Sequence, residues 1–194
     1  MIRIGFGQGF WGDSAEAPVR LVEDGPLDFL ALDYLAEVTM SILQKQFEEN
    51  AAHGYARDFP GLIERLAPAI QAKKIQVLAN AGGVNPRACA AEIRRRAPAL
   101  RVAGDNLLPR IDELLAAGER LANMDSGEII SFIRPLLRSA NVYLGAFPLA
   151  EALASGADVV VTGRCADAAL ALAPMIYRFG WREDEYDSLA PGVV

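Results

Sequence analysis

Short, mainly apolar runs alternate with longer segments of helical periodicity along this 194-residue chain. The runs that predict strands are residues 2–6, 28–32, 75–79, 100–103, 142–144 and 158–161. The segments that predict helices are residues 34–50, 59–72, 86–97, 109–117, 148–155 and 165–179. This alternation is typical of βαβ units, whose strands are parallel and whose helices cover the sheet. We therefore expect one α/β domain with a doubly wound, mainly parallel sheet of about five to six strands and helices on both faces.

Charge and cysteine content limit the classes of function. The formal net charge is −6, whereas binding to nucleic acid depends on clustered Lys and Arg that neutralise phosphates. The chain has two cysteines, Cys89 and Cys165, and this sparse usage fits a reducing compartment. No apolar stretch is long enough to span a bilayer. We expect a cytoplasmic protein without nucleic-acid or membrane partners, in which both cysteines are buried.

Loops rich in Gly, Asn and Asp follow the predicted strands. Ligands of open α/β sheets bind outside the carboxyl ends of the strands, so a small-molecule site is expected there. The candidate substrate-binding residues are Gly9, Asp13, Asn80, Gly82, Gly83, Asn85, Arg164 and Asp167. Asp33 and Asp105 are the candidate catalytic residues, because each follows a predicted strand and carries a carboxyl group for proton transfer. The alternative is that these residues form only tight turns and helix N-caps.

The loop of residues 80–86 and Arg164 have the most specific features. Gly82 and Gly83 offer backbone amides, and Asn85 with Pro86 starts a helix, a combination that suits a carboxylate, phosphate or oxyanion. A plain N-cap role for Asn85 explains the same pattern. Arg164 directly follows a strand, where its guanidinium suits an anionic ligand or a structural ion pair with Asp167.

The first loop spells GxGxxG through Gly7, Gly9 and Gly12, a pattern that also occurs in nucleotide-binding domains. The bulky Phe10 and Trp11 lie inside this pattern, so a nucleotide-binding domain is only the third hypothesis. Glu37 adds a further acid near the second strand, yet no close spacing of acids predicts a metal. The cofactor is left unassigned.

At these same loops the sequence resembles the acyclic terpene utilisation family, AtuA. The matching stretches are residues 9–13, 33–37, 54–55, 80–86, 104–105, 143–146, 156–164, 166–167 and 179–181. The resemblance implies a role in the breakdown of acyclic terpenoids such as citronellol and geraniol, through acyl-CoA thioesters. The resemblance assigns no catalytic residue to this chain. It also implies a longer protein, of which residues 1–194 are the N-terminal part.

The leading hypothesis is an enzyme, or its N-terminal half, that acts on a carboxylate or acyl-CoA intermediate. The alternative is a non-catalytic binding or scaffold subunit of a terpenoid degradation complex. The expected partners are the small-molecule ligand, a C-terminal segment or partner subunit, and further copies of the chain in a homo-oligomer. The aromatic residues Phe179, Trp181 and Tyr186 are expected to offer exposed apolar surface for such a partner.

Overall fold

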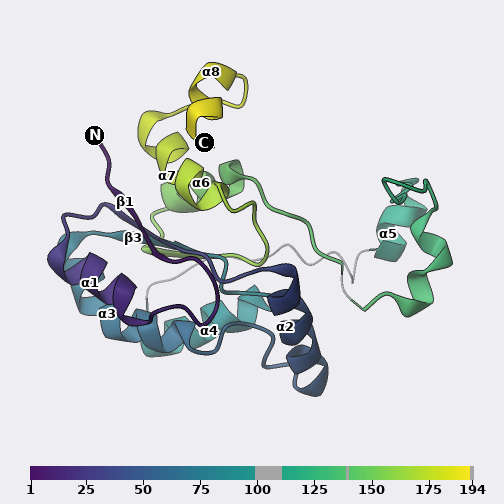
Figure 1. The fold of residues 1–194 in the computed structure, drawn as a ribbon, viewed down its shortest axis with the longest axis horizontal. Helices are drawn as coiled ribbons and strands as arrows, with labels where there is room; N and C mark the ends of the chain where they lie inside the picture. The colour runs from purple at the N-terminus through teal and green to yellow at the C-terminus, as the bar shows by residue number, and fades with distance from the viewer. Residues whose placement is uncertain (99–110, 139, 193–194) are drawn as a thin grey trace.

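The computed structural model describes residues 1–98, 111–138 and 140–192 and shows an α/β fold around one parallel sheet (Figure 1). The strands are β1 (Ile4–Gln8), β2 (Phe29–Leu32), β3 (Gln76–Ala79) and β4 (Val159–Val161). They lie in the order β1-β2-β3-β4, and every neighbouring pair is parallel. All residues of β2 and β4 are buried, as expected for continuous apolar strands covered on both faces.

Helices cover both faces of the sheet, which confirms that part of the prediction (Figure 1). One face carries α1 (Glu16–Asp24), α3 (Phe59–Lys73) and α4 (Pro86–Arg96). The opposite face carries α6 (Ala146–Ala154) and α7 (Ala169–Phe179). Neighbouring strand residues alternate between the two cores: Val77 belongs to the first core and Leu78 to the second.

The remaining elements pack less closely. Helix α2 (Glu37–Glu49) has Leu43 as its one buried residue. Residues 111–138 contain α5 (Ile111–Ala116) and two 3₁₀ turns (Ile130–Phe132 and Arg134–Leu136), and they lie to one side of the sheet (Figure 1). This segment exposes the large apolar side chains of Met124, Phe132 and Leu136. Helix α8 (Tyr186–Leu189) and a 3₁₀ turn (Ala190–Gly192) follow α7.

The prediction of five to six strands is wrong for the described residues, which contain four. Residues 142–144 do not form a strand, since Leu144 makes a single parallel bridge to Cys165. Its N–H donates to the Arg164 carbonyl at 3.1 Å and its carbonyl accepts the Ala166 N–H at 3.0 Å. Helix α6 begins two residues after Leu144, so the segment is too short to extend this ladder. The expected strand 100–103 lies outside the described residues.

Two helices begin later than predicted. Residues 34–36 precede α2 because the backbone groups of Tyr34 and Leu35 bond to side chains instead of to a helix. Residues 165–168 precede α7 because Cys165 and Ala166 pair with Leu144. Both departures lie at the carboxyl edge of the sheet, where the candidate site was predicted.

Phe179 and Tyr186 are exposed as expected, whereas Trp181 is partly buried against the core. Phe179 is 51% and Tyr186 73% exposed, and the ring of Phe179 stacks on Trp181 with centroids 5.4 Å apart. Among the described residues, the helices are all too short or too polar to cross a membrane.

Candidate functional site

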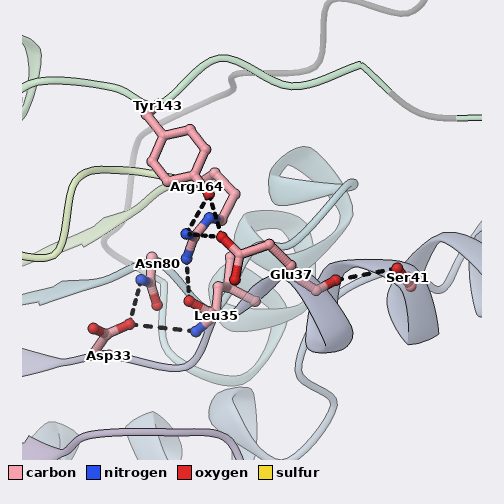
Figure 2. Close-up of polar contacts among 7 residues, drawn as sticks. All are labelled: Asp33, Leu35, Glu37, Ser41, Asn80, Tyr143 and Arg164. Atoms are coloured by element: carbon pink, nitrogen blue, oxygen red, sulfur yellow. Dashed lines mark hydrogen bonds and ion pairs between the residues drawn. The ribbon is translucent and has the colours of Figure 1, made fainter. Parts of the chain in front are cut away.

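Asp33 directly follows β2. At this edge of the sheet the carboxyl ends of β1, β2 and β3 lie side by side. Its backbone N–H donates to the Gln8 carbonyl at 3.0 Å, which ties it to the end of β1. Its carboxylate faces Asn80, the residue that directly follows β3 (Figure 2). Two side chains 47 positions apart in sequence are therefore brought together by the parallel pairing of β2 with β3.

Asn80 is fully buried and uses both ends of its side-chain amide. Its Nδ2 donates to Asp33 Oδ1 at 2.6 Å, and its Oδ1 accepts the Tyr34 N–H at 2.6 Å. The Leu35 N–H donates to the same Asp33 oxygen at 3.3 Å. Within the described part of the chain, Asp33 Oδ2 has no hydrogen-bond partner. One carboxylate oxygen is thus held in place by two donors, whereas the other has its lone pairs unused among the described residues.

The pKa of Asp33 is raised above the ordinary value of 3.8. Burial is the main cause, because it penalises the charged carboxylate, and the nearby charge of Asp167 adds to it. The hydrogen bonds from Asn80 and Leu35 and the charge of Arg164 act in the opposite direction without cancelling the effect. A half-buried carboxyl with a raised pKa beside a cation is the kind of group that performs acid–base catalysis.

Arg164 lies next to this pair, and its side chain is only 7% exposed. Its Nη1 donates to the Leu35 carbonyl, so Leu35 connects Arg164 to Asp33 through the two sides of its own backbone (Figure 2). Its Nη2 donates to the Tyr143 hydroxyl at 2.6 Å and to Glu37 Oε1 at 3.2 Å. These contacts hold the guanidinium at the start of α2.

Tyr143 completes this arrangement. Its ring lies under the guanidinium of Arg164, with 4.2 Å from Cζ to the ring centroid, a favourable cation–π contact. Its hydroxyl donates to Glu37 Oε1 at 2.6 Å. The hydrogen bond from Tyr143 is the main cause that lowers the pKa of Glu37, so the Glu37 carboxylate is ionised at neutral pH.

The two glycines of the 80–86 loop allow a close approach of chain segments. The Gly82 N–H donates to the Thr162 carbonyl at 2.8 Å, and a Cβ on Gly82 would lie 2.6 Å from that oxygen. Gly83 has a φ of +56°, and a Cβ there would lie 2.4 Å from the Gly54 carbonyl oxygen. Because the Gly82 amide is bonded within the chain, it does not offer the anion-binding donor that the sequence suggested.

Asn85 acts as a structural residue in this loop. Its Oδ1 accepts the Ala88 N–H at 3.3 Å and so caps the start of α4. Its Nδ2 donates to the carbonyls of Ala51 and His53, both at 2.9 Å. With all its side-chain donors and its acceptor in use, Asn85 fits the N-cap interpretation.

A comparison with protein families decides the wider context. The model of the acyclic terpene utilisation family protein AtuA matches residues 2–194. The chain belongs to the AtuA family. This confirms the resemblance seen at the loops and links the chain to acyclic terpene utilisation. No curated protein and no solved structure matches it.

In the first glycine loop of this AtuA-family chain, the Asp13 carboxylate accepts hydrogen bonds from backbone N–H groups of the same loop. Asp13 accepts the N–H groups of Ser14 at 2.7 Å and Gly9 at 3.2 Å, and these bonds lower its pKa. Its carboxylate therefore takes the amide donors that a nucleotide phosphate would need. The structure gives the nucleotide-binding hypothesis no support.

The other candidates of the AtuA-family chain are exposed, buried in the core or outside the described residues. Asp167 is exposed and influences Asp33 through its charge. Asp105 lies outside the described residues. Cys89 and Cys165 are buried, and burial raises the pKa of Cys165 to about 12, so this thiol stays protonated at neutral pH. In the described ranges, no group of three or more His, Cys, Asp and Glu residues is placed to hold a metal ion.

Tyr143 is the member of the site that sequence reasoning missed. It comes from a segment predicted as a strand, and its spacing from Glu37 and Arg164 carries no pattern of its own. The one available signal was its place in residues 143–146, a stretch that carries the resemblance to the AtuA family.

Proposed function

We propose that this chain is an enzyme, or part of one, that transfers protons on a carboxylate or acyl-CoA intermediate of acyclic terpenoid breakdown. Membership of the AtuA family supports the context of acyclic terpene utilisation. The observation that supports the reaction type is the Asp33 carboxyl, which has one oxygen held by Asn80 and Leu35 and the other free. Its raised pKa fits the same role.

In the proposed reaction Asp33 acts on a carbon next to a thioester carbonyl. The C–H bond breaks and the proton passes to Asp33 Oδ2. The electron pair of that bond forms a C=C bond to the carbonyl carbon, and the π pair of the carbonyl moves to its oxygen, which gives an enolate. The reverse step returns a proton from Asp33 to carbon. Asn80 and Leu35 keep the carboxylate from rotating, which lowers the entropy that must be lost before transfer.

Solvent exchange tests this proposal without requiring the complete reaction. The CoA thioester of citronellic acid is incubated with the protein in D₂O, and NMR follows deuterium entry next to the carbonyl. We expect the wild-type chain to accelerate exchange and Asp33→Asn to abolish the acceleration. Asp125→Asn is the matched control, because Asp125 is exposed and lies outside the cluster. Equal exchange with and without the Asp33 carboxyl contradicts the proposal.

Asp105 remains a proposed second acid–base residue, and the same assay with Asp105→Asn tests it. The proposed location is the cytoplasm, which the sparse cysteines support.

A second candidate function is that of a binding or scaffold subunit. The exposed Met124, Phe132 and Leu136 favour it, because exposed apolar patches mark interaction surfaces. The exposed Phe179 and Tyr186 support the proposals of a homo-oligomer and of a C-terminal segment or partner subunit. Binding of the thioester without any Asp33-dependent exchange would favour this second function.

A further inference from the structure

Strand β1 forms one edge of the sheet, and its outer side is unpaired among the described residues. On its inner side, the Arg3 carbonyl accepts the Phe29 N–H at 3.1 Å. Because alternate residues of a strand face the same way, the backbone of Gly5 also faces β2, whereas the N–H and carbonyl groups of Ile4 and Phe6 point outward. An open edge of this kind is a template for pairing with another strand.

Helix α1 lies beside β1 (Figure 1), and a groove of about 610 Å³ runs between the helix and the strand edge. Phe6, which is 50% exposed, lines this groove together with Leu21, Arg20 and Asp24 of α1. The groove thus combines apolar surface and charges of both signs with the open backbone groups of a strand, and this combination suits a protein partner.

Two close approaches define the register of α1 on β1. A Cβ on Gly5 would lie 3.4 Å from Leu21 Cδ1, and a Cβ on Gly7 would lie 2.8 Å from Pro18 Cβ. Since Pro18 precedes Leu21 while Gly7 follows Gly5, the helix runs antiparallel to the strand. Leu21 therefore marks the level of Gly5 along the edge.

Arg20 and Asp24 lie on either side of that level, one helical turn apart, and both are exposed. In the part of the chain that the structure describes, neither makes a hydrogen bond or an ion pair, and Arg20 acts on Glu16 through its charge alone. Glu16 is already held by Arg65, with contacts of 2.6 Å and 3.0 Å. A cation and an anion without ion-pair partners on one helix face make that face complementary to a copy of itself.

We infer that two copies of this chain pair β1 with β1 in antiparallel fashion, across a two-fold axis at Gly5, so that their sheets join into one. Ile4 of each copy then lies opposite Phe6 of the other, and each such pair exchanges both N–H···O bonds. Gly5 meets Gly5 on the axis, where the absence of side chains permits a close approach. Arg20 of each copy lies opposite Asp24 of the other, which gives two reciprocal ion pairs.

This inference rests on the homo-oligomer of the proposed function, because it names the surface of that oligomer, and it does not involve the chemistry of Asp33. A second copy fits the edge better than an unrelated strand does, since the charges beside the edge complement each other across the axis.

Sedimentation velocity of the protein up to millimolar concentration tests the inference, and the wild type is expected to dimerise. Arg20→Glu sets an acid against Asp24 of the other copy, and Asp24→Arg sets a cation against Arg20. Each single variant is expected to dimerise roughly tenfold or more weakly, because two ion pairs become two repulsive contacts. An equimolar mixture of the two variants is expected to dimerise about as well as the wild type, since every facing pair again has opposite charges.

Two further variants complete the test. Lys45→Glu reverses an exposed cation on α2, away from β1, and is expected to leave dimerisation unchanged. Phe6→Pro removes an outward N–H and keeps the bonds to β2, so it is expected to give a monomer. The thermal midpoint of each variant shows whether it is folded.

Several outcomes overturn the inference. A wild-type chain that stays monomeric leaves the edge to a strand of another protein. Single variants that dimerise like the wild type, or a mixture that associates no better than its components, place any dimer on another surface, such as that of Phe179 and Tyr186. If Asp33-dependent exchange is observed in a monomer, this inference alone fails. If the dimer forms as inferred but exchange does not depend on Asp33, the proposed reaction alone fails.

Discussion

The side-chain amide of Asn80 donates to Asp33 Oδ1 at 2.6 Å across the ends of two neighbouring strands. Because the other end of the amide accepts the Tyr34 N–H, Asn80 cannot rotate without breaking both bonds. The orientation of the Asp33 carboxylate is thus determined by a fully buried neighbour. Asn80 is a positioning residue in the proposed reaction.

Asn80→Ala is expected to destabilise the fold by about 2–4 kcal/mol, because it removes two buried hydrogen bonds and leaves the Tyr34 N–H unsatisfied. The loss of its hydrogen bond also raises the pKa of Asp33 further. Chemical denaturation measures the stability. The control is Asn50→Ala, an exposed site at the end of α2. A cost for Asn80→Ala no larger than that for Asn50→Ala contradicts this account.

Asp33→Asn is expected to change the pH dependence of stability. The folded-state pKa of Asp33 is raised above 3.8, so its contribution to stability is present below that pH and is lost as pH rises through the folded-state value. The neutral Asn avoids this loss. Relative to the variant, the wild type should therefore lose stability between acid and neutral pH, as measured by thermal midpoints. A constant difference between the two proteins would show that Asp33 titrates normally.

Gly83→Ala is expected to be strongly destabilising, by roughly 2 kcal/mol or more, since the new Cβ adds a left-handed backbone penalty to a clash. That Cβ would lie 2.4 Å from the Gly54 carbonyl oxygen and 2.5 Å from Leu43 Cδ1. Gly145→Ala is the matched control, because a Cβ there meets nothing within 4 Å. Similar urea midpoints for the two variants would rule out the close approach of these segments.

The cysteines are expected to resist thiol reagents in the folded protein. Both are buried, and burial raises the pKa of each thiol, that of Cys165 to about 12, so little thiolate forms near neutral pH. Labelling with a disulfide reagent should be slow in buffer and rapid in denaturant. Fast reaction of one thiol in the native state would contradict the burial of that cysteine.

The sequence predicted the parallel sheet because strands such as Val159–Val161 are continuous apolar runs. It also placed Asp33, Asn80 and Arg164 at one edge, since the carboxyl ends of parallel strands meet there. The alternation of strands and helices along the sequence does not reveal which partners the groups in a loop bond to. The Gly82 amide, expected to bind an anion, is taken by Thr162, a contact between residues 80 positions apart. Tyr143 was missed for the same reason, because its partner Glu37 is 106 positions away.

The pH profile of deuterium exchange tests the central role of Asp33 most directly. The rate of exchange in the citronellic acid thioester is measured from acid to neutral pH for the wild type, Asp33→Asn and Asn80→Ala. The wild-type rate is expected to rise with ionisation of Asp33, with a midpoint above 3.8. The midpoint is expected to be higher still in Asn80→Ala, and exchange is expected to be lost in Asp33→Asn. A wild-type profile without such a rise, or one that Asp33→Asn leaves unchanged, would contradict the account.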